Sequence, residues 1–525
     1  MTILQQIKRR ILRWLGLERL SDDPASRRYD FINSEETVRR QRLEECRIWY
    51  VGDSDELENF YTGRNTGGNA EEPIYNRNKW NYFWSRAVRG DEQPAKKVHS
   101  GVPHAIVDTL CNVIGCPTVS APGKEDEIRA IEDANDFARK LTQEARPLTL
   151  VEGWGAWKVL FDKSISDRPS LQYYEGKDVD FVVRSGILMG IIYKDYYKSK
   201  GEDYVLLETR RITQEGDSVI EYELFRYSKS GEAEQVPLST LDDTASLPED
   251  GLVIPGLKKV LGVPCRYFYD VFSKDYGRSI FEGKIDVFDD IDQCLSQASQ
   301  TDRVSTPVEY YPVEFMQKDS DGHEGFPQTY NRQYVKIPAI ADGDGRINAT
   351  ITTTQPQLNF AQYAERYKSL LDVALTGILS PASMGIDVSR RDNADAQREK
   401  EKVTLFTRSN IIDSETRQLK ELFRIALMVQ DYMDTGSFPL EEPEVSVKYG
   451  EFANPSFENL SRVLLPLLTS GGISPAMYVE RLYGDSLSSE EKAKEVAAIE
   501  ERMKADSTDV LSELMGENAT AGDGE

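Results

Sequence analysis

The chain has 525 residues, which is too long for one ordinary domain and predicts several. Apolar residues make up 39% and aromatic residues 10%, so the chain can bury real hydrophobic cores and is not wholly disordered. With 64 basic and 89 acidic residues the net charge is −25, which would repel polyphosphate and excludes a protein that coats DNA or RNA. A role beside nucleic acid that does not require a tight grip remains open.

Three features bear on membranes and compartments. No run of about 18 apolar residues occurs, so no transmembrane helix is expected. The first apolar stretch is interrupted by basic residues, which is not typical of a secretory signal peptide. The five cysteines are sparse and odd in number, so a disulfide framework is not expected and a reducing cytoplasm is favoured.

The N-terminal part is expected to be helical. Residues 3–15 carry isoleucine and leucine at helical spacing on one side and basic residues on the other, which predicts a basic amphipathic helix. Such a helix either docks on nucleic acid, a membrane or a partner protein, or covers a core or a subunit edge. A second helix is expected over 34–50, between Ser34 and Gly52, and the Gly- and Asn-rich stretch 63–78 is expected to be a loop.

The pattern then changes from helical to extended. Residues 99–123 have an apolar middle, either helix or strand, with turns at both ends, and 125–144 are typical of a polar amphipathic helix. From about 151 to 270, short segments rich in Val, Ile, Tyr and Phe are separated by turn residues, which predicts a mostly antiparallel β region. The Gly-, Pro- and Ser-rich insert 228–256 within it is expected to be a loop.

Helical patterning returns in the second half of the chain. Residues 278–303 predict a helix with an apolar stripe and strongly acidic remaining faces. A small β island is expected over 304–354, followed by a second helix over 357–376 and an exposed Gly- and Ser-rich loop over 377–393. The remaining elements expected are a long helix over 394–433, a strand over 444–450 and a helical C-terminal part.

No recognisable catalytic or nucleotide-binding motif occurs: HExxH, CxxC, GxSxG, Walker A and GxGxxG are all missing. His99 and His104, with Cys111 and Cys116, lack the spacing of a standard zinc-ligand set, so core residues are expected there instead. Carboxylates are abundant, but the sequence selects no pair for acid–base chemistry. We therefore expect no catalytic residue, no metal and no cofactor, and we favour an assembly protein over an enzyme.

Four stretches are distinctive when they are taken in chain order. They are the pattern YxGDxxxL over 50–57, HSGVPHAIVDTL at 99–110, GRSIFEGKIDVFDDIDQCLSQASQTDR at 277–303 and GGISPAMYVERLYGDSLSSEEKAKEVAAIEER at 471–502. Together with the order of the predicted elements, they resemble the portal proteins of tailed double-stranded DNA bacteriophages. The resemblance covers roughly residues 30–510, and the loop 377–393 matches by position and composition.

The resemblance implies an α+β, multidomain subunit with a mainly helical core, a β-rich wing and a small β clip, which assembles into a ring. The implied parts are the N-terminal segment and wing (1–277), the first stem helix (278–303), the clip (304–356), the second stem helix (357–376), the tunnel loop (377–393), the long wing helix and strand (394–450), the crown (451–510) and a disordered tail (511–525).

Portal proteins form a ring, typically of twelve subunits, at one capsid vertex, and the genome is packaged and ejected through its channel. The resemblance implies double-stranded DNA as the passing ligand, and the terminase large subunit, a head–tail adaptor, the major capsid protein and a scaffolding protein as partners. It implies a place in the virion and, during assembly, in the host cytoplasm. It also implies a channel lined by Glu282, Asp286, Asp289 and Asp290 of the stem and by Ser380, Ser383, Met384, Asp387, Ser389, Arg390 and Arg391 of the tunnel loop.

An acidic stem fits a channel in which DNA must slide, because it repels the duplex and keeps it centred. In a monomer the same helix would have an ordinary solvated face. Arg390 and Arg391 either touch phosphates transiently or pair with Asp387 and Asp392. Two other classes remain open: a soluble carboxylate-based hydrolase, and another phage head structural protein such as a capsid protein or connector. The size of the protein in solution separates a ring from a monomeric hydrolase.

Overall fold

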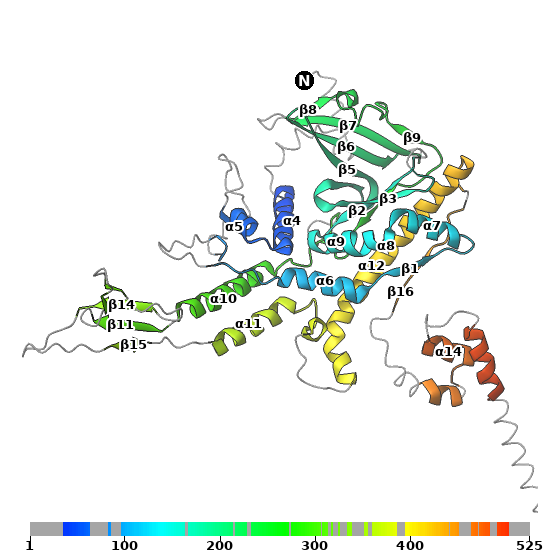
Figure 1. Ribbon diagram of the computed structural model, residues 1–525. Coiled ribbons are helices and arrows are strands. Elements are labelled where there is room, and N and C mark those ends of the chain that lie inside the picture. Colours follow the sequence, from blue (N-terminus) through cyan, green and yellow to red (C-terminus); the bar gives the residue numbers. More distant parts are fainter. Residues whose placement is uncertain are drawn as a thin grey trace, which may run out of the picture. The chain divides into compact units, whose positions relative to one another are not determined.

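The computed structural model describes a large part of the chain, in which two compact units are found, Met1–Tyr449 and Gly450–Glu525 (Figure 1). The helix expected over 3–15, the loop expected over 63–78 and the tail expected over 511–525 lie outside the described residues. The described residues are 35–62, 82–85, 96–162, 166–213, 216–227, 233–271, 275–305, 307–312, 317–318, 324–325, 333–338, 351–354, 360–385, 394–439, 441–450, 464–470, 472–483 and 491–502.

Helices and strands both build the larger unit, as expected for an α+β chain. Four helices pack together near its N-terminal end: α4 (Glu35–Val51), α5 (Ser54–Thr62), α6 (Val102–Ile114) and α9 (Arg146–Glu152). The helix expected over 34–50 is therefore confirmed as α4. It is followed by Gly52, whose φ of 72° turns the chain out of the helix. The apolar middle of 99–123 forms a helix, α6, rather than a strand.

The single helix expected over 125–144 is wrong. The chain instead forms α7 (Glu125–Asn135), a short α8 (Phe137–Arg139) and a π-helical turn (Lys140–Ala145) before α9 begins. The interruption occurs at Asp136, whose φ of 47° is left-handed. A left-handed residue cannot continue a right-handed helix, so the helix axis changes direction there.

The β region expected from about 151 to 270 is confirmed as two antiparallel sheets. The larger has the strand order β4-β5-β6-β7-β8, with β9 also paired to β7, and the smaller has the order β10-β2-β3. The strands are β2 (Gly155–Leu160), β3 (Ser170–Glu175), β4 (Val179–Arg184), β5 (Ile187–Ser199), β6 (Glu202–Ile212), β7 (Ser218–Tyr227), β8 (Ala233–Val236), β9 (Leu252–Ile254) and β10 (Gly262–Cys265).

The insert 228–256 is not only a loop, because β8 and β9 lie within it. Both are short, of four and three residues, and both pair with β7. The residues of β8 carry little strand signal, whereas those of β9 favour a strand but form a run of only three. Hydrogen bonds to β7 hold both segments extended.

The long helix α12 (Ala394–Thr435) agrees with the helix expected over 394–433. It packs against α6, α7, β2 and β10, and its C-terminal half supplies the centre of the largest core. That half is apolar on several sides, since Leu419, Leu422 and Phe423 are all fully buried. After α12 the chain returns along β16 (Ser446–Tyr449), which pairs antiparallel with β1 (Pro117–Ser120).

Two helices, α10 (Ile285–Val304) and α11 (Phe360–Leu375), form an antiparallel pair in the larger unit (Figure 1). The expected β island lies between them in the chain. It contains a mixed sheet of order β14-β11-β15 and a separate pair of strands. The strands are β11 (Val308–Pro312), β12 (Gln317–Lys318), β13 (Glu324–Gly325), β14 (Gln333–Ile337) and β15 (Thr352–Thr354).

The helix expected to begin at residue 278 begins at Ile285 instead. Residues 280–284 form turns, and Gly283 has a φ of 76°, which a right-handed helix does not accommodate. The amphipathic pattern therefore places the start of this helix too early in the chain.

The C-terminal unit is helical where it is described. It contains helical segments at 464–469 and 491–502 and, between them, α14 (Pro475–Tyr483). The Ser474 hydroxyl accepts a hydrogen bond from the backbone N–H of Met477 at 3.2 Å, so Ser474 is the N-cap of α14 and Pro475 occupies its first helical position. A small core holds the unit together, made of Leu464, Leu468, Tyr478, Val479 and Leu482.

Candidate functional site

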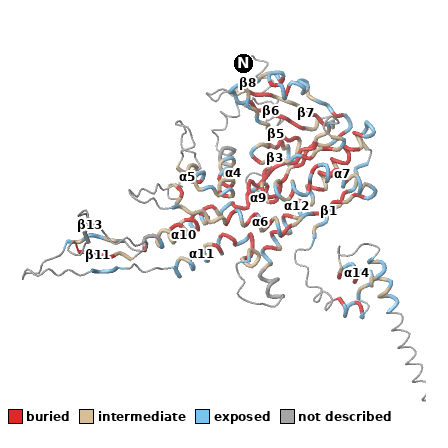
Figure 2. The backbone as a smooth tube through the Cα atoms, viewed as in Figure 1, coloured by how far each residue is buried: buried red, intermediate tan, exposed pale blue. Residues whose placement is uncertain are grey.

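The pair α10–α11 is the candidate site, because the expected stem residues lie on it or directly before it. α11 buries one stripe, which ends in Leu371, Ala374 and Leu375. Most of its other residues are exposed (Figure 2), and among them Phe360 and Val373 are 46% and 51% exposed. Against the residues that the structure describes, α11 therefore has a broad exposed face.

Contacts between the two helices set their antiparallel register. The Cys294 thiol lies 3.7 Å from the backbone oxygen of Tyr363 near the middle of the pair. At the end near Ile285, the Lys284 ammonium donates to the backbone oxygens of Val373 and Thr376, at 2.8 and 2.9 Å. A cation at these carbonyls satisfies groups that the end of α11 leaves open and opposes its dipole.

Two of the four expected stem residues are exposed on α10. The Asp290 side chain lies at the surface, and Asp286, one turn earlier, is also exposed while its carboxylate accepts a hydrogen bond from the Tyr82 hydroxyl. Glu282 does not lie on the helix but in the turn before it, 3.6 Å from Arg42 of α4. Asp286 and Asp290 are thus the stem carboxylates that α10 offers to its surroundings.

Asp289 is buried within the subunit and has no surface with which to line a channel, which corrects the expectation for this residue. Its side chain is 5% exposed, and the backbone N–H of Phe83 donates to its Oδ2 at 2.8 Å. Asp292, one turn further along α10, is fully buried. It accepts bonds from the Trp84 indole at 3.1 Å and from the Ser100 backbone N–H at 2.8 Å.

The environment of Asp289 shifts its titration. Burial raises the pKa of Asp289 to about 6, and the backbone N–H groups of Phe83 and Trp84 oppose that rise. The neighbouring carboxylates of Asp292 and Asp290 raise it further. One signal in the sequence points to this burial: Asp289 and Asp292 flank Ile291 one turn apart, on a helix whose apolar stripe includes Phe288.

The structure describes only the first part of the expected tunnel loop. Ser380 and Ser383 lie at a short 3₁₀ turn after α11 (Pro381–Met384), and both bond to Thr404 of α12. The Ser380 backbone N–H donates to the Thr404 hydroxyl at 2.9 Å, and the Ser383 hydroxyl lies 2.8 Å from it. Met384 packs against the core that α10 and α11 share. Asp387, Ser389, Arg390 and Arg391 lie outside the described residues.

Ser380 is 6% exposed, so its side chain does not line a channel. The turn from Ser380 to Met384 is fixed against α12, whereas an exposed loop was expected over 377–393. The physical reason is that Thr404 offers a buried hydroxyl, and a buried hydroxyl requires hydrogen-bond partners.

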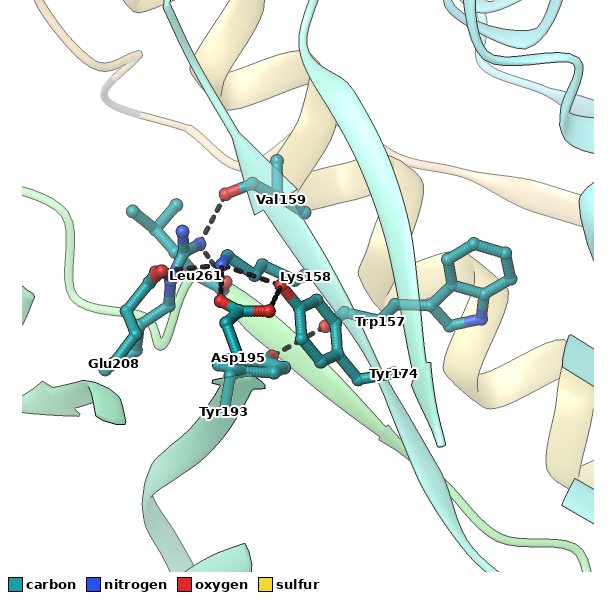
Figure 3. A network of polar contacts seen from close by, with 9 residues as sticks. Trp157, Lys158, Val159, Tyr174, Tyr193, Asp195, Glu208 and Leu261 are labelled. Atoms are coloured by element: carbon teal, nitrogen blue, oxygen red, sulfur yellow. Dashed lines mark hydrogen bonds and ion pairs between the residues drawn. The ribbon is translucent and has the colours of Figure 1, made fainter. Parts of the chain in front are cut away.

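A second polar cluster joins the two sheets of the larger unit (Figure 3). Lys158 on β2 lies 2.5 Å from Glu208 of β6 and 3.2 Å from the Tyr174 hydroxyl of β3. Arg210 donates to Glu208 at 2.6 Å and also to two backbone oxygens, those of Val159 and Leu261. Lys158 and Arg210 therefore donate hydrogen bonds to groups of the same subunit.

The charges of this cluster balance one another once Asp195, whose Oδ2 lies 4.0 Å from the Lys158 ammonium, is counted. Burial lowers the pKa of the Lys158 ammonium, and the nearby Glu208 carboxylate only partly opposes this. Burial would raise the pKa of Glu208, but Arg210 and Lys158 together bring it below its usual value. The side chains of Lys158, Glu208 and Arg210 are 6% exposed or less. We interpret the cluster as a junction between sheets, since substrate has no access to it.

His99 and His104 do not converge with the cysteines on a metal site. His99 bonds to Asp292 at 2.8 Å, whereas His104 pairs with Asp108 at 3.1 Å and stacks on Tyr50. Among the residues that the structure describes, no group of three metal-ligating side chains occurs. All five cysteines are described, and none of them forms a disulfide.

A cavity of about 520 Å³ lies beside the end of α12, lined by residues that include Phe161, Tyr432 and Asp434. None of the expected site residues contributes to its lining. Within the described part of the chain, no helix combines the length and the apolar character needed to cross a bilayer.

Comparison with known proteins assigns no family. No protein-family model matches the chain, and no curated protein is significantly similar to it.

Proposed function

We propose that this chain is the subunit of a phage portal ring, the DNA channel at the capsid vertex through which the genome is packaged and ejected. The observation that carries the proposal is the order of α10, the β island and α11. The chain runs along α10 into the β island, returns along α11, which packs on α10, and continues into the long helix α12. In the proposed ring, α10 and α11 are the stem, the β island is the clip, and the chain from Gly377 towards α12 is the tunnel loop.

The surface of the helix pair supports repetition around an axis. The exposed face of α11 includes Phe360 and Val373, and apolar side chains of this size are costly to leave in water. Head-to-tail packing of identical pairs covers such a face in every subunit, and it closes into a ring when the rotation between neighbours closes.

The charge of the described stem supports a channel in which DNA slides. Asp286 and Asp290 are exposed on α10, and every copy in a ring would add the same two carboxylates. A ring of carboxylates repels phosphates and holds a duplex at the axis, whereas a basic lining would bind it. The proposed partners are double-stranded DNA, the terminase large subunit, a head–tail adaptor, and the capsid and scaffolding proteins.

Negative-stain microscopy of the purified full chain, combined with mass photometry, tests the proposal. We expect rings with a central hole, near twelve subunits, and a particle mass of several hundred kilodaltons. A single species near the mass of one chain, which forms no rings at high protein concentration or with capsid components, would refute it.

A further inference from the structure

Two short segments, residues 82–85 and 96–100, form hydrogen bonds with one face of α10. Together we name them the aromatic clamp. Their contacts fall at four positions of α10 spaced three or four residues apart: 286, 289, 292 and 296. At the last position the Val98 backbone N–H donates to the Ser296 hydroxyl at 2.9 Å. This spacing places all four acceptors on one face of the helix.

The opposite side of the clamp contacts α4 and α5. The Tyr82 ring lies 5.1 Å from the ring of Tyr61 on α5, and the His99 ring lies 5.7 Å from Trp49 on α4. The Lys97 ammonium lies 3.7 Å from Glu58 of α5. The aromatic clamp therefore connects α10 to the N-terminal helices through polar bonds on one side and rings on the other.

We propose that the aromatic clamp is a proton-linked conformational device, which closes on α10 more firmly as the solution is acidified. The geometry behind this proposal is the enclosure of Asp289. In the closed clamp the Asp289 Oδ2 accepts the Phe83 N–H, and its Oδ1 is buried without a hydrogen-bond partner. A buried carboxylate oxygen that lacks a donor disfavours the ionised form.

The direction of the linkage follows from the pKa of Asp289. Closure raises this pKa from an ordinary value of 3.8 to about 6, so the closed state takes up a proton at a higher pH than the open state. Above pH 6 the carboxylate is ionised in both states, and the closed state carries the full cost of desolvation. As the pH falls from 6 to 4, the equilibrium constant for closure rises by a factor on the order of 100.

Several charged or titratable groups face Asp289 from the surrounding elements. On α10 these are Asp290 and Asp292, and on the clamp they are Lys97, near the Trp84 ring, and His99, which bonds to Asp292. From α5 the Tyr61 hydroxyl faces the carboxylate, and it bonds in turn to Glu45 of α4. Because burial raises the pKa of Tyr61 far above its usual value, it stays neutral. A test must therefore isolate Asp289 from His99.

Hydrogen–deuterium exchange of the full-length chain, compared between the wild type and variants of Asp289, separates the effect of Asp289 from that of His99. The amides of Phe83 and Ser100 donate to Asp289 and Asp292, so the protection of peptides that contain them reports clamp closure. After correction for the intrinsic pH dependence of exchange, we expect protection in the wild type to rise about tenfold from pH 7.5 to pH 5. In Asp289→Asn this pH dependence should be strongly reduced.

Asp290→Asn is the matched control, because it removes the same charge from the next residue of the same helix, where the side chain is exposed. This variant should retain most of the wild-type pH dependence, because Asp290 has the smallest of the named effects on the pKa of Asp289. Equal pH dependence in the wild type and Asp289→Asn, or its equal loss in both variants, overturns the proposal. If Asp289→Asn fails to fold, the wild type decides alone: protection that stays constant or falls between pH 7.5 and pH 5 overturns it.

Discussion

One ion pair, Arg146 with Glu415, ties helix α9 to the middle of α12. Both side chains are almost fully buried, with exposures of 0% and 1%. The Arg146 Nε donates to Oε2 at 3.1 Å and its Nη2 donates to Oε1 at 3.2 Å, so the pair is bidentate. Burial raises the pKa of Glu415, although Arg146 opposes the rise, which shows that desolvation is the larger effect.

Removing one partner of this pair should be far worse than removing both. We predict that Arg146→Met lowers the stability of the larger unit by about 3–5 kcal/mol, because it leaves Glu415 buried without a cation. The double variant Arg146→Met/Glu415→Leu should recover most of that loss. Chemical denaturation followed by circular dichroism measures both. Arg139→Met, which breaks an exposed pair with Asp136, is the control and should leave the midpoint unchanged.

The stability lost in Arg146→Met should also depend on pH. Without the arginine the pKa of Glu415 in the folded state rises further above its unfolded value. The folded variant then binds more protons than the unfolded chain, so part of the lost stability returns as the pH is lowered. A single variant as stable as the wild type at neutral pH would contradict this account.

Single residues show where the sequence was informative about the candidate site. The exposed carboxylates Asp286 and Asp290 were expected from the acidic face of the helix, and they are exposed. Asp289 lies on the same acidic sequence but is buried, because its partners Phe83 and Trp84 come from about 200 residues away in the chain. A helical pattern reports the helix's own faces and not the segments that cover them.

The same limit applies to the elements. Local periodicity was enough to predict α4, α12 and the strands β5 to β7, which are long or strongly patterned. It failed at Asp136 and Gly283, where one left-handed residue interrupts an otherwise continuous pattern. It could not predict the pairing of β1 with β16, which joins residues more than 300 positions apart and is decided by tertiary packing.

At one glycine, the end of α9 lies directly against the segment that leads into α10. Gly153 follows α9 with a φ of 94°, and a Cβ atom there would lie 2.6 Å from the backbone carbon of Arg278. Next to this contact the Ile280 N–H donates to the Leu150 oxygen at 2.9 Å. The residues before α10 can approach α9 this closely only because position 153 has no side chain.

We predict that Gly153→Ala is more destabilising than Gly123→Ala. Gly123 has a similar φ of 78°, but a Cβ atom there would have no neighbour within 4 Å, so alanine incurs only the backbone cost, about 1–2 kcal/mol. Alanine at 153 adds a backbone collision that costs roughly another 1–3 kcal/mol. Thermal unfolding of the two variants measures the difference. Equal midpoints would show that the approach of Arg278 can relax.

At the scale of the whole larger unit, buried polar junctions add to the hydrophobic cores that join its parts. The Lys158–Glu208–Arg210 cluster joins the two sheets, Arg146–Glu415 joins α9 to α12, and the aromatic clamp joins α10 to α4 and α5. Each junction requires precise placement of its side chains, because a buried polar group that lacks some of its hydrogen bonds destabilises the folded state. Such junctions favour one arrangement of the parts, which suits a subunit that must present the same faces in every copy of a ring.

The N-terminal half of α12 offers a second face for assembly. Thr404 and Thr407 point inward, whereas Val403 and Phe406 are 39% and 67% exposed, one turn apart. A phenylalanine exposed to this extent contributes little to the isolated subunit. Buried against a neighbouring subunit, an aromatic anchor typically contributes about 2 kcal/mol.

We therefore predict that Phe406→Glu weakens ring assembly and leaves subunit stability unchanged. The loss of about 2 kcal/mol at each interface corresponds to roughly 30-fold weaker pairing, and a buried carboxylate adds to it. Mass photometry over a concentration series should show the ring population shifting to monomers, with the unfolding midpoint of the subunit unaltered. Ile187→Glu, which changes a side chain of nearly equal exposure on the large sheet, is the control. If Ile187→Glu disrupts rings and Phe406→Glu does not, the subunits meet through the sheet and not through α12.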